Sequence, residues 1–98
     1  MSSGVQLDAM LVRTPGVCGG RLRIEGTRVT VLQITALYKR GESAEEIAQN
    51  FPHLKLGQVY AALAYYHANR TEVEQEFADE SAEFDRLKAQ YEPTSIQP

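Results

Sequence analysis

Few side chains in this sequence of 98 residues could support catalysis or bind a metal. Cys18 is its only cysteine, and His53 and His67 are its only histidines. The histidines have no metal-ligand spacing to the cysteine or to an acidic residue, and no base lies near Cys18 in the sequence. The glycine-rich residues 16–20 lack the lysine and hydroxyl side chain of a phosphate-binding loop. We therefore expect a binding protein without metal, cofactor or small-molecule substrate, and not an enzyme.

The charged residues are divided unevenly along the chain. Residues 1–70 contain eight basic and five acidic side chains, whereas residues 71–98 contain two basic and eight acidic ones. The first part therefore carries a net charge of +3 and the second a net charge of −6. A basic segment suits a polyanion such as nucleic acid, and an acidic segment suits a basic partner or water.

Two groups of residues are candidates for contacts with DNA. Arg21, Arg23 and Arg28 surround a short predicted strand, where they could bind phosphates or simply form its solvent face. Lys55 stands at the expected start of the third helix, where lysine is an unfavourable cap but could contact a phosphate. Gln58 and Tyr65 on that helix could contact bases or backbone, or be ordinary surface residues.

Three observations bear on the location of the protein. No apolar stretch approaches the roughly 20 residues needed to span a bilayer. The first residues lack the basic and apolar regions of a signal peptide. One cysteine cannot form an internal disulfide. We therefore expect a cytoplasmic protein with no membrane association.

The residue pattern predicts one short strand followed by four helices. The alternation of polar and apolar residues over 21–25 is typical of a half-buried strand. Capping boxes that begin at Thr30 and Ser43 predict the first two helices, which end at Gly41 and Pro52. A third helix is expected over about 56–69. A third capping box at Thr71 predicts a fourth helix that extends to about residue 91.

The third helix has an expected core face and an expected exposed face. Helical spacing places five apolar residues on the core side: Leu56, Val59, Tyr60, Leu63 and Tyr66. Gln58, Ala61 and Tyr65 fall on the opposite side, which a helix-turn-helix protein would present to a DNA groove.

The fourth helix carries a narrow apolar stripe, which is typical of packing against a single neighbouring helix. We expect this stripe to bind a partner protein through Val73, Phe77, Phe84, Leu87 and Tyr91. Residues after 91 are expected to be disordered.

Several motifs resemble those of the domain-of-unknown-function family numbered 433. They are GVCGGR at residues 16–21, IEGTRV at 24–29, GESAEEIA at 41–48, FPHL at 51–54 and VYAALAYY at 59–66. The resemblance implies a small, dimeric helix-turn-helix-like domain. It also implies an antitoxin of a type II toxin–antitoxin module, whose partner is a PIN-like ribonuclease. The chain departs from the family pattern at Leu22, where proline is frequent, and at Lys55, where threonine or serine is usual.

We therefore expect a mainly α fold with a three-helix, helix-turn-helix-like (winged-helix-like) core, a short N-terminal β-strand and a long C-terminal helix. Residues 1–70 would form the strand and core, and residues 71–98 the acidic helix and tail of the same domain. An unpaired strand would leave an exposed edge, so we expect it to pair with its copy in a homodimer.

The expected function is that of an antitoxin that binds a PIN-like toxin and its own operator DNA. The alternative is a protein-interaction or transcription-accessory module that keeps the helix-turn-helix core and does not bind DNA by itself. The net charge of −3 and the absence of arginine on the third helix favour this alternative.

Overall fold

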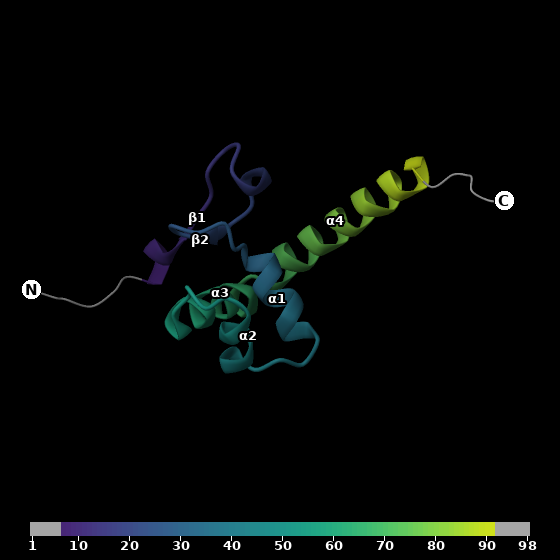
Figure 1. Cartoon of the computed structure of the whole chain (residues 1–98). Coiled ribbons are helices and arrows are strands. Elements are labelled where there is room, and N and C mark those ends of the chain that lie inside the picture. Colours follow the sequence, from purple (N-terminus) through teal and green to yellow (C-terminus); the bar gives the residue numbers. More distant parts are fainter. Residues whose placement is uncertain (1–6, 92–98) are drawn as a thin grey trace, which may run out of the picture.

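The computed structural model describes residues 7–91 (Figure 1). The predicted mainly α fold, with a short N-terminal strand region and a long C-terminal helix, is confirmed. In chain order the elements are η1 (Leu7–Met10), β1 (Leu11–Val12), η2 (Cys18–Gly20), β2 (Arg23–Ile24), α1 (Val31–Lys39), α2 (Ala44–Asn50), α3 (Leu56–Ala68) and α4 (Arg70–Tyr91). No helix in residues 7–91 is long and apolar enough to cross a membrane.

Both predicted capping boxes at the starts of α1 and α2 are confirmed. The hydroxyl of Thr30 accepts from the backbone N–H of Gln33 at 3.1 Å, and Gln33 Oε1 accepts from the N–H of Thr30 at 2.9 Å. Ser43 and Glu46 make the same reciprocal pair at 3.1 and 2.8 Å. These bonds satisfy N–H groups that have no partner inside the helix, so each helix begins where its cap stands.

The strand that we expected to pair with a second copy pairs within its own chain. β2 lies antiparallel to β1, with Leu11 opposite Ile24 and Val12 opposite Arg23. On its other side the chain returns to form a bridge between Arg23 and Thr30. The sequence prediction failed here because β1 has only two residues, too few to show an alternating pattern. Both edges of β2 are therefore occupied without a partner chain.

The core lies between β2 and the first three helices. α3 is packed against α1, α2, α4 and η1, and its neighbours on several sides bury more of its surface than an amphipathic pattern predicts. Ala61 is buried, whereas Leu56 and Tyr60 are exposed, so the predicted division of this helix into two faces was wrong for these three residues. Alanine at 61 and 62 leaves room for close packing, which hydrophobicity alone does not reveal.

The start of α4 also differs from the prediction. Only Asn69 separates α3 from α4, and Thr71 lies inside the first turn of α4, so it does not cap the helix. The N–H of Val73 bonds instead to the carbonyl of Asn69 at 3.0 Å. Val73 then packs with Leu32 and Tyr66 in a second small cluster of buried residues. This cluster joins the first turns of α4 to the body of the domain.

Candidate interaction surfaces

The exposed side of α3 offers little to a nucleic acid. No lysine or arginine occurs between Leu56 and Ala68. The most exposed large hydrophobic side chain on α3 is Tyr60, which is 50% exposed and whose hydroxyl lies 3.4 Å from Glu45 Oε2 on α2. A carboxylate beside this face opposes the approach of phosphates. α3 is therefore a weak candidate for a recognition helix.

The two predicted DNA contacts at the start of α3 interact with each other. Gln58 Oε1 accepts from the backbone N–H of Lys55 at 2.7 Å. This bond forms one half of a capping box, and the lysine side chain cannot supply the other half because it has no acceptor. Gln58 thus caps its own helix, while the Lys55 side chain is exposed.

Two further predicted DNA residues are engaged inside the fold. Arg23 is half-buried, and its guanidinium donates to the carbonyl of Thr27 at 2.9 Å and to Thr14 Oγ1 at 2.8 Å. The Tyr65 hydroxyl donates to Glu72 on α4 at 3.0 Å. Burial, and then this hydrogen bond, raises the pKa of Tyr65 above its ordinary value. Arg23 therefore holds the loop between the strands, and Tyr65 holds α4 against α3.

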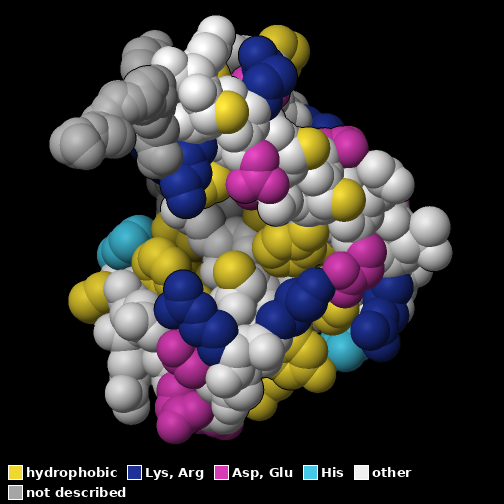
Figure 2. Space-filling model, turned by 90° about the vertical axis from the view of Figure 1, so that its right-hand side faces the viewer, with side chains coloured by type: hydrophobic (Ala, Val, Ile, Leu, Met, Phe, Trp, Pro, Cys, Tyr) yellow, Lys and Arg dark blue, Asp and Glu magenta, His cyan; other side chains and the backbone are white. Residues whose placement is uncertain are grey.

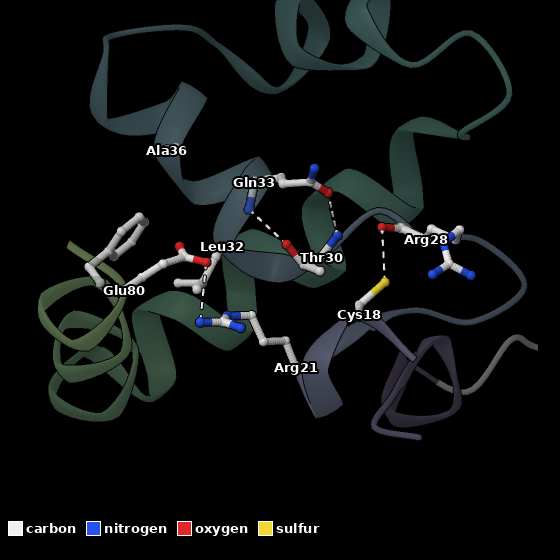
Figure 3. Close-up of a pocket in the computed structure, with 9 residues that line it drawn as sticks. Cys18, Arg21, Arg28, Thr30, Leu32, Gln33, Ala36 and Glu80 are labelled. Carbon is white, nitrogen blue, oxygen red and sulfur yellow. Dashed lines mark hydrogen bonds and ion pairs between the residues drawn. The ribbon is translucent and has the colours of Figure 1, made fainter. Parts of the chain in front are cut away.

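The remaining predicted pair, Arg21 and Arg28, lies at an open pocket of about 330 Å³ (Figure 3). Arg21 reaches across this pocket to Glu80 of α4, with 3.2 Å between Nη2 and Oε2. Arg28 is exposed and makes no ion pair with another residue in the described part of the chain. Thr30 and Gln33 line the α1 side of the pocket, and Phe77 lines the α4 side.

An adjoining pocket of about 220 Å³ shares Arg21 and adds Arg13, a residue that the sequence analysis missed. Arg13 Nη2 lies 3.3 Å from Glu76 and 3.6 Å from Glu72, and its Nη1 donates to the carbonyl of Gly20 at 3.3 Å. No local pattern singles out Arg13, because its partners on α4 are about 60 residues away. Arg13 and Arg21 therefore face the same side of α4, whereas Arg28 lies at the end of its pocket away from α4 (Figure 3).

The near half of α4, residues 70–80, is docked on the domain. Val73, which we predicted to bind a partner, is 1% exposed and belongs to the chain's own core. Phe77 is partly buried, and the Lys39 ammonium lies 4.5 Å from the centre of its ring. Lys39 Nζ also pairs with Glu74 at 2.7 Å. The near half is thus held by apolar burial at its centre and by ion pairs around it.

The far half of α4, residues 81–91, projects away from the domain (Figure 1). Every side chain from 81 to 90 is exposed, including Phe84 at 63% and Leu87 at 40%. The side chain of Tyr91, the last residue of the predicted partner-binding set, lies outside the described side chains. Viewed from the side toward which α4 projects, hydrophobic side chains lie among lysine and arginine side chains (Figure 2). Phe77 and Phe84 both line a shallow apolar hollow on this helix.

The side chains considered for catalysis lie apart. The thiol of Cys18 donates to the carbonyl of Arg28 at 3.4 Å. His67 packs its ring on Tyr38 and Tyr66, with ring centres 5.3 and 5.2 Å away, and His53 is exposed in the turn before α3. No group of three or more side chains suited to a metal ion occurs in residues 7–91.

The model of one protein family, described as "Protein of unknown function (DUF433)", matches residues 11–66. The chain belongs to the DUF433 family. The match runs from β1 to α3 and ends before α4, so the projecting helix lies outside it.

A solved structure agrees with this assignment. It is the crystal structure of a DUF433 member from Anabaena variabilis, which is 36% identical in sequence to this chain. The two structures superpose with a TM-score of 0.66, over 74% of this chain and 71% of the other. A comparison with curated proteins found no match.

Proposed function

We propose that this DUF433 protein is an antitoxin-type interaction module that binds a protein partner through the far half of α4. The observation that carries the proposal is the exposure of Phe84 and Leu87 on a helix segment with no support from the rest of the domain. Short helices are marginal in water, and most helices in proteins gain their stability by packing an apolar face. A partner that covers Phe84 and Leu87 would supply that packing.

The spacing of these residues indicates the mode of binding. Phe84 and Leu87 are three residues apart and therefore lie on one face of α4, continuous with Phe77 at the hollow near the domain. This arrangement suits a helix whose apolar face enters a groove of another protein. The charged residues of the far half, Glu83, Asp85, Arg86 and Lys88, balance in sign. Specificity would then come mainly from the shape of the apolar groove.

The family resemblance suggests a PIN-like ribonuclease toxin as the partner, and a second copy of the chain is a further candidate. The test uses such a nuclease encoded next to this protein, and measures how well purified protein inhibits cleavage of a labelled RNA. We expect the double substitution Phe84→Asp and Leu87→Asp to weaken inhibition strongly, because two charges would enter an apolar groove. The matched control is Ala82→Asp and Ala89→Asp, which places the same charges on the opposite face of the helix.

Equal inhibition by both double variants would reject the far half as the toxin-binding surface. Sedimentation velocity of the same variants tests the second copy as partner. A homodimer lost only in the Phe84 and Leu87 variant would assign this face to self-association.

Operator binding is the second half of the antitoxin function, and one observation favours it. Arg28 is exposed at the other end of the pocket from Arg21 (Figure 3) and is free of ion pairs with other described residues. The alternative, an accessory module that does not bind DNA alone, is favoured by the lack of cations on α3. Fluorescence anisotropy with the protein's own upstream DNA and a scrambled duplex separates the two. Tighter binding to its own DNA supports a specific repressor, and absent binding supports the accessory module. Equal binding to the two duplexes would reject a specific repressor and show DNA binding without sequence preference.

A further inference from the structure

The two adjoining pockets at Arg21 form one continuous surface between the strand region and α4. We call it the arginine groove, and it consists of Arg13, Arg21, Arg28, Gly19 and Gly20. On the opposite side of the pockets stand carboxylates of α4, namely Glu76, Asp79 and Glu80. The groove is therefore a cationic surface that already faces a set of anions belonging to the same chain.

These anions are arranged in a row. Glu72, Glu76 and Glu80 follow one another at intervals of four residues, which places them on one face of α4 about 6 Å apart along its axis. Arg13 pairs with the first two and Arg21 with the third. The two arginine side chains thus lie along a row of regularly spaced carboxylates. One small ligand would supply only a single anion in place of this row.

The ion pairs in this row are weak and exchangeable. The paired side chains are between 29% and 52% exposed, and exposed ion pairs contribute little stability and are screened by salt. The near half of α4 has other attachments, because Val73 is buried in the core and Glu74 pairs with Lys39. Arg13 and Arg21 can therefore turn toward an external anion while α4 stays docked.

We infer that the arginine groove binds the phosphate backbone of a nucleic acid, and that Glu72, Glu76 and Glu80 occupy it in the free protein. This inference deepens the DNA-binding half of the proposed function and rests on it. Arg28, which has no ion pair with a described residue, lines the other end of the pocket from Arg21 (Figure 3) and would add a third contact farther along the backbone. Backbone contacts carry no sequence information, so the groove holds nucleic acid with little regard to sequence.

The experiment measures fluorescence anisotropy of the full chain with a labelled duplex of random sequence. Glu76→Gln with Glu80→Gln removes two of the competing carboxylates. Glu42→Gln with Asp85→Asn is the matched control, because it changes the net charge equally at residues that form no ion pair in the described structure. We expect the first variant to bind clearly more tightly than the control. Three phosphate contacts should weaken binding about 40-fold between about 50 and 200 mM salt.

A second pair of substitutions locates the site. In the Glu76→Gln, Glu80→Gln background, Arg21→Gln with Arg28→Gln should abolish the gain, whereas Arg40→Gln with Lys55→Gln should leave most of it. Circular dichroism checks that each variant is folded. If the glutamate double variant unfolds, the single variant Glu80→Gln provides the same comparison. It releases Arg21 from its ion pair with Glu80, while Arg13 stays paired with Glu76 on α4.

Equal gains in the glutamate variant and its charge control would overturn the inference, since only overall charge would then matter. Loss of binding through Arg40 and Lys55 would overturn it as well, because the nucleic acid would lie elsewhere. The absence of nucleic-acid binding in every variant would also overturn the inference. None of these results bears on toxin inhibition through Phe84 and Leu87, which the ribonuclease assay measures separately.

Discussion

The buried side chain of Tyr66 donates its hydroxyl to Glu74 Oε2 at 2.6 Å, and thereby links α3 to α4. The other oxygen of the same carboxylate accepts from Lys39 Nζ of α1 at 2.7 Å. One glutamate therefore joins three helices beside the buried Val73. The hydrogen bonds from Lys39, and then from Tyr66, lower the pKa of Glu74, and the bond to Glu74 is the main reason that the pKa of Tyr66 is raised.

The first prediction concerns the pH dependence of this link. Because the folded-state pKa of Glu74 is lowered, its contribution is complete above its ordinary pKa of about 4.5 and is lost as the pH falls through the folded value. Because the pKa of Tyr66 is raised, its contribution is complete below its ordinary value of 10.0 and is lost as the pH rises through the folded value. In thermal unfolding, the difference in stability between the wild type and Glu74→Gln should therefore be largest between about pH 4.5 and pH 10.0. A difference in stability that stays constant as the pH falls below this range would contradict the proposed role of Glu74.

The second prediction separates a structural from a DNA-binding role for Arg23. Arg23→Lys should lower the free energy of unfolding by about 1–3 kcal/mol, because lysine cannot keep both bonds of the guanidinium fork to Thr14 and Thr27. Arg28→Lys, at an exposed position in the same segment, should change it by less than about 0.5 kcal/mol. Urea unfolding monitored by circular dichroism measures both. A stable Arg23→Lys protein that binds DNA poorly would instead support the sequence-based assignment.

The third prediction concerns a buried hydroxyl. Thr35 in α1 is 0% exposed, and its Oγ1 has no hydrogen-bond partner in the described structure. Thr35→Val keeps the shape and removes the unsatisfied group, so it should raise the free energy of unfolding by about 1 kcal/mol. Thr35→Ser keeps the hydroxyl and removes a methyl group, and should lower it by about 1 kcal/mol. Chemical denaturation in which valine destabilises the protein would show that the hydroxyl has a partner in solution.

The fourth prediction distinguishes the two halves of α4. Val73→Ala should cost about 2 kcal/mol of unfolding free energy, because it opens space in the cluster with Leu32 and Tyr66. Phe84→Ala should change it by less than about 0.5 kcal/mol, since the ring is 63% exposed. Differential scanning calorimetry of the isolated protein tests both. A large loss of stability in Phe84→Ala would show that the ring is already covered in solution.

Local sequence was sufficient for the elements whose signals are themselves local. The capping boxes at Thr30 and Ser43 connect residues only three positions apart, and the structure confirms both. The long C-terminal helix and the mainly α class were also predictable from patterns that repeat within a few residues. The motifs between residues 16 and 66 further indicated the family, and the family model confirms that relationship.

The tertiary structure alone decided which of the candidate residues share a surface. The sequence grouped Arg21, Arg23 and Arg28 by proximity, but folding turns Arg23 inward to Thr14 and Thr27 and places Arg13 beside Arg21. It likewise assigned Val73 to a partner, whereas the short connection at Asn69 returns α4 onto α1 and α3 and buries that residue. These outcomes depend on contacts between residues up to 63 positions apart. Periodicity within one helix reports that a face is apolar, and it carries no information on which neighbour covers that face.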